Sequence, residues 1–321
     1  MTLTAPPRPV PPKAAAVPRR WSRPIAAAGS VRTLISAADL ARPRARAVYF
    51  VVLTAAVLVT LLVFVFPLYW MVTGALKSAP ELAQPRPSLV PKAPHPQTYA
   101  DAWTRLQIAH FFLNTVLYAI GGWLVQLVVD VSAAYALSKL RPVLGNVVLG
   151  MMLASLMLPA AALLVPAYLT VSNVPLVHLN LLNTPWALWL PGAANAFNIY
   201  VLKRFFDQIP DDILESASLD GAGRLRILWN IVVPLSRPVL AVVSIFSVIG
   251  IWKDFLWPLL VLQDPQSQTL SVALSRLSST GRVPLNELLA GLVIASVPMI
   301  GAFLAFQRQI LGGLAAGSLK G

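Results

Sequence analysis

The sequence contains no cysteine, and this absence excludes disulfide bonds, thiol catalysis and thiolate metal sites. Its three histidines, His95, His110 and His178, have no second metal ligand at helical spacing, so we expect no metal site. Charged residues make up only 12% of the 321 residues, whereas hydrophobic residues make up 57%. A mean hydropathy of +0.71 is too apolar for an ordinary soluble domain and indicates a membrane protein.

Motifs of the common enzyme classes are also missing. The sequence has no Gly-x-Ser-x-Gly nucleophile elbow and no Gly-x-x-x-x-Gly-Lys-[Ser/Thr] phosphate-binding loop. The Gly221-Ala222-Gly223 segment lacks the preceding strand and the third glycine of a dinucleotide-binding fingerprint. An enzyme acting inside the membrane would need a catalytic pair within the apolar segments, and none is visible. We therefore expect a protein that is not an enzyme and cannot hydrolyse ATP by itself.

Long apolar runs account for most of the chain. A hydrocarbon core of about 30 Å requires about 20 helical residues at about 1.5 Å each. The clearest run, 47–70, contains no charge and ends in Tyr69-Trp70, aromatic residues suited to a membrane interface. The five further runs are 111–137, 147–171 (interrupted by Pro159 and Pro166), 186–201, 239–262 and 288–306. The sequence predicts an all-α, multi-pass membrane protein with six transmembrane helices.

The distribution of positive charge predicts the orientation, because cytoplasmic segments retain an excess of lysine and arginine. With six spans, the two termini and the second and fourth loops share one side, which carries 18 of the 25 basic residues. Both termini are therefore expected in the cytoplasm. Residues 1–46 are basic and rich in proline and alanine, and we expect a disordered cytoplasmic tail. The net charge of +13 is explained by orientation and anionic lipid headgroups, so no nucleic-acid partner is expected.

The loop between the fourth and fifth predicted spans has the signals of a helix-turn-helix. Pro210 and the two aspartates after it suit a helix start, because proline is tolerated there and carboxylates complement the helix dipole. Gly221 is placed to end this helix in a left-handed conformation, and a second helix is expected from about Arg224 towards Pro234. From the residues alone, a loop with five acids and five bases is equally well explained as a solvated connector.

The same loop resembles the EAA motif of permease subunits of bacterial ABC importers. That motif reads Glu-Ala-Ala, three residues, Gly, nine residues, Ile, one residue, Leu, Pro. The residues at matching positions are Glu215, Ala217, Gly221, Ile231 and Pro234. Ser216 replaces the second motif residue and Val233 replaces the leucine, both small or isosteric changes. The flanking Asp220 and Ala222 are also typical of the sugar-importer branch.

The resemblance extends over residues 47–321 and is closest to the second permease of maltose-type importers. The further matching positions are Asn114, 133–137 with Lys139, Pro159, 166–168, 205–206, 209–210, 252–255, Pro258, and 307–308 through Gly312 and Gly317 to Lys320 and Gly321. Lys253 stands where the family usually has asparagine, so the resemblance assigns it no role. A core permease domain over about 110–307, a coupling loop at 207–234 and a cytoplasmic C-terminal tail at 307–321 are implied.

The resemblance implies a type I importer in the bacterial inner membrane. Two permeases form a heterodimer around a central pathway, two ATPase subunits bind below, and an extracytoplasmic solute-binding protein delivers the solute. ATP and magnesium are expected on the ATPase partner, and no cofactor is expected on this chain. In the coupling loop Glu215 would supply polar contacts to the ATPase, Ala217 a close approach and Gly221 the turn. The full expected coupling set is Glu215, Ser216, Ala217, Asp220, Gly221, Ala222, Ile231 and Pro234, and the expected tail contacts are Gln307, Gly312, Lys320 and Gly321.

Charged residues inside the predicted spans are a second set of functional candidates. A charge at mid-bilayer costs about 2.5 to 3.5 kcal/mol on insertion scales, so Asp130, Lys253 and Asp254 are functional candidates. Together with Trp252 they are our candidates for the pathway of a sugar or sugar-like solute. Alternatively, Asp130 lies near an interface, Lys253 pairs with Asp254 or reaches the surface, and Trp252 belongs to an aromatic belt. An ion-coupled secondary transporter using Asp130 and Asp254 is the alternative function, although it would need no ATPase-docking loop and no inverted repeat is visible.

Overall fold

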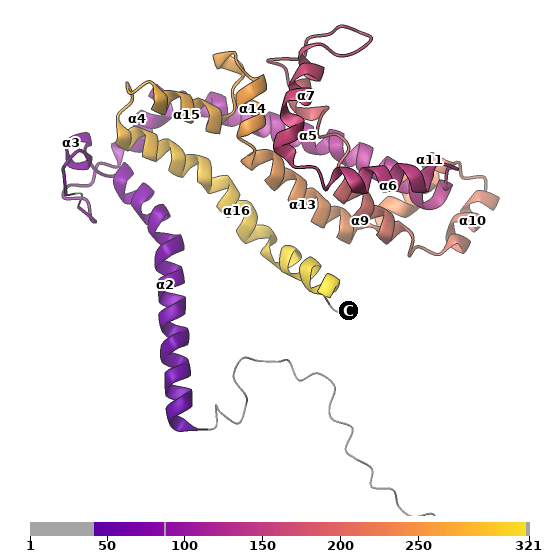
Figure 1. Ribbon diagram of the computed structural model, residues 1–321, viewed down its shortest axis with the longest axis horizontal. Helices are drawn as coiled ribbons and strands as arrows, with labels where there is room; N and C mark the ends of the chain where they lie inside the picture. The colour runs from indigo at the N-terminus through magenta and orange to yellow at the C-terminus, as the bar shows by residue number, and fades with distance from the viewer. Residues whose placement is uncertain (1–41, 87, 319–321) are drawn as a thin grey trace, which may run out of the picture. The chain divides into compact units, whose positions relative to one another are not determined.

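The computed structural model describes residues 42–86 and 88–318, and for 308–318 it describes the helical backbone alone. The described residues form helices joined by loops, without a strand among them (Figure 1). Of the disordered tail expected at 1–46, residues 1–41 lie outside this range, whereas 43–46 are helical; the expected ATPase contacts Lys320 and Gly321 also lie outside it. The chain divides into two compact units, Met1–Phe64 and Val65–Gly321, and each is described by itself.

The boundary between the units falls inside helix α2, Pro43–Ala75. The first unit contributes the part of α2 up to Phe64, which starts with a proline, a residue compatible with a first helical turn. From residue 47 to its end α2 carries no charged side chain. It therefore contains the whole of the first predicted span and is long and apolar enough to cross a membrane.

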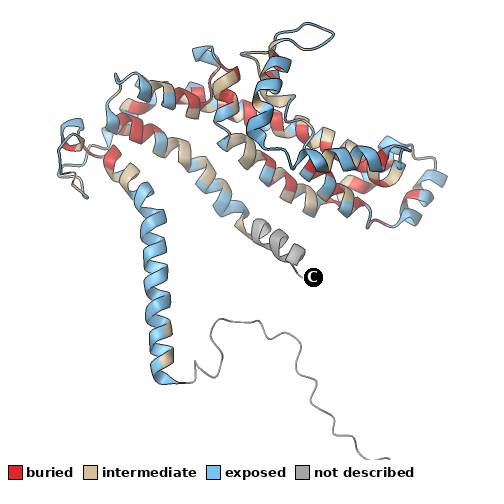
Figure 2. Ribbon diagram, viewed as in Figure 1, coloured by how far each residue is buried: buried red, intermediate tan, exposed pale blue. Residues whose placement is uncertain are grey.

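The second unit is built around helix α5, Ile108–Tyr135, which continues into a π-helical turn η1, Ala136–Leu140. Helices α9 (Ala196–Phe206) and α13 (Arg237–Lys253) pack against α5, as do α4 (Gln97–Arg105), α8 (Trp186–Trp189) and α15 (Leu270–Ser279). Helix α16, Leu285–Ser318, packs against α4 and α15. Buried residues follow α5 and its neighbours, which makes α5 the centre of this unit (Figure 2).

Helices α6 (Gly145–Ser155) and α7 (Ala160–Ser172) are covered by little of this chain. Large apolar side chains on them are exposed, among them Val147, Met151, Leu163 and Val165 (Figure 2). Apolar side chains that are exposed over two helices are better suited to contact with lipid or a partner helix than with water.

Three of the predicted spans coincide with single helices that are long and apolar enough to cross a membrane: Pro43–Ala75, Ile108–Leu140 and Leu285–Gln307. Two further candidates are bent pairs, Gly145–Ser155 with Ala160–Ser172 at 111° and Arg224–Leu235 with Arg237–Lys253 at 84°. The predicted third span, 147–171, is thus interrupted just before Pro159. Proline disfavours the α conformation of the preceding residue, so the helix ends there.

The predicted fourth and fifth spans are not continuous helices. Residues 186–201 comprise the short α8 and the start of α9, separated by a segment that contains Pro191 and Gly192. The fifth predicted span, 239–262, is divided between α13 and α14, Leu256–Val261, with extended backbone at Asp254. These breaks lie side by side in the second unit, where they surround the larger of the two cavities described below.

Candidate functional site

The coupling loop contains helix α10, Asp211–Leu219, at the place that the sequence predicts. Pro210 precedes it in an extended conformation, and two aspartates occupy its first turn, where they complement the helix dipole. At its other end the amide of Ala222 donates to the carbonyl of Ala217 at 3.0 Å, and the amide of Gly221 donates to that of Ser218 at 3.1 Å. Gly221 has φ +84°, so the predicted left-handed stop is confirmed.

The second half of the loop is also helical, as predicted. It consists of α11 (Arg224–Ile227), a π-helical turn η2 (Leu228–Val232) and α12 (Val233–Leu235). The wide turn directly precedes Pro234, which has no amide hydrogen to continue an α-helical ladder. The two halves pack on each other and form the helix-turn-helix.

One side of this helix-turn-helix is buried in the second unit. Leu214, Ile227 and Leu228 join a core cluster with Phe206 and Ile209, so α10 is anchored to the end of α9. Of the expected coupling residues, Ala217, Ala222 and Ile231 are half-buried against that cluster. The methyl group of Ala217 therefore faces the core of this chain.

The other side of the loop is exposed and includes Ser216 and Asp220, whereas Glu215, which is also exposed, lines a groove of about 390 Å³ together with Arg141 and Arg224. Two leucines that the sequence reasoning missed also lie on the exposed side, Leu219 with 90% and Leu225 with 74% of its surface exposed. Their signal in the sequence is an apolar residue on each side of a polar Asp-Gly turn. The exposed side thus combines polar residues with two apolar side chains, a composition suited to a protein partner.

Polar contacts fix the start of α10 to the end of α5. The Lys139 ammonium donates to the carbonyl oxygen of Ile209 at 2.6 Å and to Oδ1 of Asp211 at 2.7 Å, and Arg141 donates to Oδ2 at 3.2 Å. The hydrogen bond from Lys139 and its positive charge hold the pKa of Asp211 below its usual value. One turn earlier, the Ser138 hydroxyl donates to Asp207 at 2.7 Å. Helix α10 is therefore held to the bundle at its base and by its buried side.

The expected tail contacts are only partly described. Gln307 lies on α16, where its side-chain amide donates to the carbonyl of Leu304 at 3.1 Å. Gly312 belongs to the helical backbone of the same helix. The contacts of these residues with an ATPase stay predictions.

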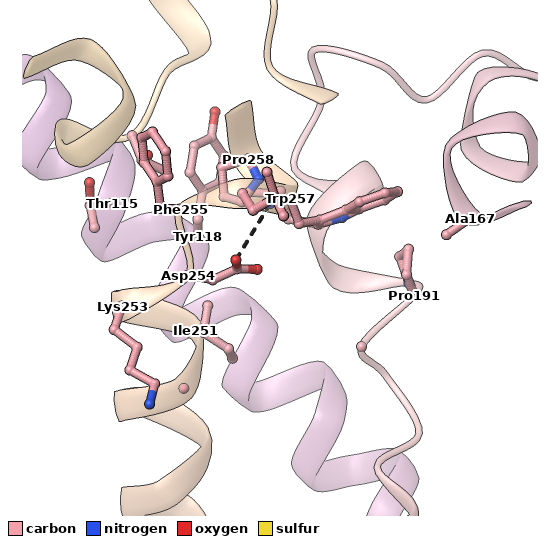
Figure 3. Close-up of a pocket in the computed structure, with 15 residues that line it drawn as sticks. Thr115, Tyr118, Ala167, Pro191, Ile251, Lys253, Asp254, Phe255, Trp257 and Pro258 are labelled. Carbon is pink, nitrogen blue, oxygen red and sulfur yellow. Dashed lines mark hydrogen bonds between the residues drawn. The ribbon is translucent and has the colours of Figure 1, made fainter. Parts of the chain in front are cut away.

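Two of the candidate pathway residues, Lys253 and Asp254, line a cavity of about 680 Å³, here called the pathway cavity. Figure 3 shows it between α5, the break after α13 and the segment that follows α8. Thr115, Tyr118, Lys253, Asp254 and Trp257 are among its lining residues. A second cavity of about 300 Å³ is lined by Trp252, Lys253 and the hydroxyl residues Ser271 and Ser296. The structure thus brings three of the four candidates, Trp252, Lys253 and Asp254, to two cavities that share Lys253.

The aromatic side chains around these cavities are held by hydrogen bonds and ring contacts. The Trp257 indole donates to the carbonyl of Ala187 at 2.9 Å, and the Tyr118 hydroxyl donates to that of Ser267 at 2.7 Å. Trp252 packs edge to face with Phe112, with ring centroids 5.8 Å apart. Because their polar atoms already have partners, Trp257 and Tyr118 offer the cavity mainly their rings.

Asp130 is not among the residues that line the pathway cavity. It is fully buried inside the second unit, where Oδ1 accepts the Asn195 amide at 2.9 Å and Oδ2 accepts the Asn198 side chain at 3.0 Å. The Asn198 side chain also donates to Ser247 on α13 at 3.1 Å. Asp130 therefore joins α5 to the start of α9 and, through Asn198, to α13. The sequence reasoning missed both asparagines, although asparagine is a favoured N-cap residue and the Asn195 side chain accepts the Asn198 backbone amide at 3.1 Å.

The family is decided by comparison with known proteins. Residues 126–311 match the family described as binding-protein-dependent transport system inner membrane component. The chain belongs to this family. It is a permease subunit of an ABC importer, and the membrane location and transport function that the sequence predicts are confirmed.

Individual relatives agree with this assignment. The permease is 30% identical over 272 residues to Protein LplC of Bacillus subtilis, covering 80% of this chain and 90% of that protein. It is 29% identical over 262 residues to the diacetylchitobiose uptake system permease protein NgcG of Streptomyces coelicolor, covering 80% and 85%. These relatives include transport permeases and do not favour the ion-coupled alternative.

A solved structure has the same fold. It is that of a bacterial ABC transporter involved in the import of the acidic polysaccharide alginate, with a TM-score of 0.72 and 23% identity. The match covers 83% of this chain and 98% of that chain.

Proposed function

We propose that this permease forms half of the translocation pathway for a sugar or sugar-like solute and is driven by a separate ATPase that binds α10. The observation that supports the coupling role is the two-sided character of α10. Its inner side is packed and hydrogen-bonded to α5 and α9, whereas Ser216 and Leu219 are exposed. Glu215 is also exposed and lines the groove between α10, α11 and the end of α5. A helix anchored on one side and exposed on the other transmits a push from a partner to the bundle as a nearly rigid body.

The six-span topology with both termini in the cytoplasm is part of this proposal. The third span would be the bent pair of α6 and α7, the fourth would be α9 with the α8 segment before it, and the fifth would be α13 with α14. Because the chain has no cysteine, a single Asp212→Cys substitution in the same loop, at an exposed residue outside the EAA-like motif, provides a clean label site. An impermeant maleimide should label it from the cytoplasmic side only, and labelling from the outside would contradict the orientation.

Three partners complete the proposed importer. A second permease would cover the exposed apolar faces of α6 and α7. An ATPase dimer, carrying ATP and magnesium, would bind α10 together with Gln307, Gly312, Lys320 and Gly321 of the C-terminal tail. An extracytoplasmic solute-binding protein would deliver the solute. The printed functions of NgcG, diacetylchitobiose uptake, and of the structural relative, alginate import, support a carbohydrate as that solute.

The coupling role is tested by comparing two acids of α10. Both Asp212 and Glu215 are exposed, but only Glu215 belongs to the EAA-like motif. We expect Glu215→Gln to lower uptake and solute-stimulated ATPase activity about tenfold, the effect of about 1.4 kcal/mol lost at an interface. The control Asp212→Asn removes the same charge and should change both by less than about twofold. Equal rates in wild type and Glu215→Gln, with both proteins inserted in the membrane, would refute the assignment.

A further inference from the structure

Lys253 is placed where no charge is expected. It is the last residue of α13, which together with α11 and α12 forms a bent pair long and apolar enough to cross a membrane. The side chain is exposed and lines both the pathway cavity and the smaller cavity beside it. A lysine at membrane depth is costly, so it requires either a partner or a function.

The acid next to Lys253 does not serve as that partner. The four ion pairs found among the described residues do not include Lys253. The carboxylate of Asp254 instead accepts the backbone amide of Trp257, at 3.5 Å, at the start of α14. Figure 3 shows the two side chains pointing in different directions, with the carboxylate of Asp254 directed towards Trp257 and the lysine extending away from it. Pairing of Lys253 with Asp254 is therefore excluded in this conformation.

Lys253 also does not reach towards the membrane surface at the end of its helix. In Figure 3 its ammonium group lies beside the preceding turn of α13, the direction in which helical side chains normally lean. The ammonium group is thus directed along the cavity wall. The smaller cavity that Lys253 lines also contains the hydroxyl residues Thr115, Ser271 and Ser296 in its wall, which are neutral hydrogen-bonding groups.

The residues that line the two cavities indicate which chemical groups a bound ligand would carry. The rings of Tyr118 and Trp257 provide apolar surfaces of the kind that stack on a sugar ring. The carboxylate of Asp254 and the hydroxyl residues can bind sugar hydroxyl groups. Lys253 adds three donors and a positive charge, which neutral sugars do not require but a carboxylate or phosphate does.

Resting on the proposed function, we propose that Lys253 binds the anionic group of the solute and that the importer carries an anionic carbohydrate, one bearing a carboxylate or a phosphate. Lys253 then acts as a specificity-determining residue of the pathway. Its charge is compensated by the solute during passage, which explains why it has no acidic partner among the described residues.

The test uses cells that express the whole importer and a mixed panel of solutes. The panel contains uronic acid disaccharides, hexose phosphates and the neutral sugars of matching size and linkage, and mass spectrometry follows the uptake of each. We expect uptake of anionic members, with Lys253→Gln lowering it about tenfold and Lys253→Arg largely preserving it. Arg282→Gln, which removes an exposed charge from the loop before α16, is the control and should leave uptake within about twofold of wild type.

Two outcomes would overturn the inference: uptake of neutral members only, or a Lys253→Gln variant that loses uptake of anionic and neutral members to the same degree. The failure of the proposed function gives a different result. If Glu215→Gln leaves uptake unchanged, the coupling assignment fails. If Glu215→Gln abolishes uptake while Lys253→Gln does not alter the preference for anionic solutes, only the role of Lys253 fails.

Discussion

Lys139 and Asp211 connect the end of the central helix α5 and η1 to the first turn of α10 through a 2.7 Å ion pair. The side chain of Lys139 is only 5% exposed, whereas that of Asp211 is 49% exposed. Lys139 uses a second donor for the carbonyl of Ile209, in the turn before α10. The lysine is thus a buried clamp that holds both the backbone and the side chain at the start of the coupling helix.

Because Lys139 makes both contacts, its replacement should weaken the attachment of α10 much more than replacement of the neighbouring Arg141. Lys139→Met should destabilise the attachment of α10 by about 1–3 kcal/mol, because it leaves the Ile209 carbonyl and the Asp211 carboxylate without their main donor. Arg141→Met removes a 3.2 Å contact from a side chain that is 70% exposed and should cost less than about 1 kcal/mol. Hydrogen exchange of the amides of residues 211–219 in the purified importer measures this difference. Equal protection in the two variants would show that Lys139 does not hold the loop.

The same experiment has a pH dependence of known sign. The pKa of Asp211 is lowered in the folded protein by the Lys139 hydrogen bond and charge, so the ion pair contributes stability above the ordinary value of about 4. That contribution is lost as the pH falls through the lowered pKa. The advantage of wild type over Lys139→Met should therefore be constant between pH 7 and pH 5 and shrink below about pH 4.

Gly221 and Gly223 form a matched pair for testing the turn after α10. An added Cβ at either position meets no atom within 4 Å, but Gly221 has φ +84° whereas Gly223 has φ −71°. Gly221→Ala should destabilise the turn by about 1–2 kcal/mol and reduce uptake, whereas Gly223→Ala should have little effect. Gly221→Asn should be intermediate, because asparagine tolerates the left-handed conformation. Uptake rates at equal membrane levels measure the series, and similar losses at both glycines would refute the role of φ.

Local signals explain why the coupling loop could be predicted from the sequence. A proline with two aspartates starts α10 and a glycine ends it, and each acts through backbone geometry within a few residues. The continuous helices around residues 47–70, 111–137 and 288–306 were predictable for a similar reason, since uninterrupted apolar length determines them.

The remaining features depend on tertiary packing. Hydropathy over 186–201 does not reveal that Pro191 and Gly192 separate α8 from α9, because both sides of the break are apolar. Nor does it show which side of α10 is covered, so the exposure of Leu219 and Leu225 could not be derived. Asp130 was recognisable as an unusual charge, but its partners lie 65 and 68 residues away in the sequence. Only the packing of α5 against α9 brings them together.

Asp130 provides a test that separates a structural role from ion transport. In the structure its two oxygens accept hydrogen bonds from the backbone amide of Asn195 and the side chain of Asn198, so Asp130→Leu leaves the buried Asn198 donor without this acceptor and should cost about 1–3 kcal/mol. Asp130→Asn keeps one acceptor, and reorientation of the Asn198 amide can restore the second bond, so this variant should be milder and retain transport. Thermal unfolding of the purified importer and uptake together measure both effects. An ion carrier would require the titratable group itself, so a stable Asp130→Asn variant without transport would contradict the structural role.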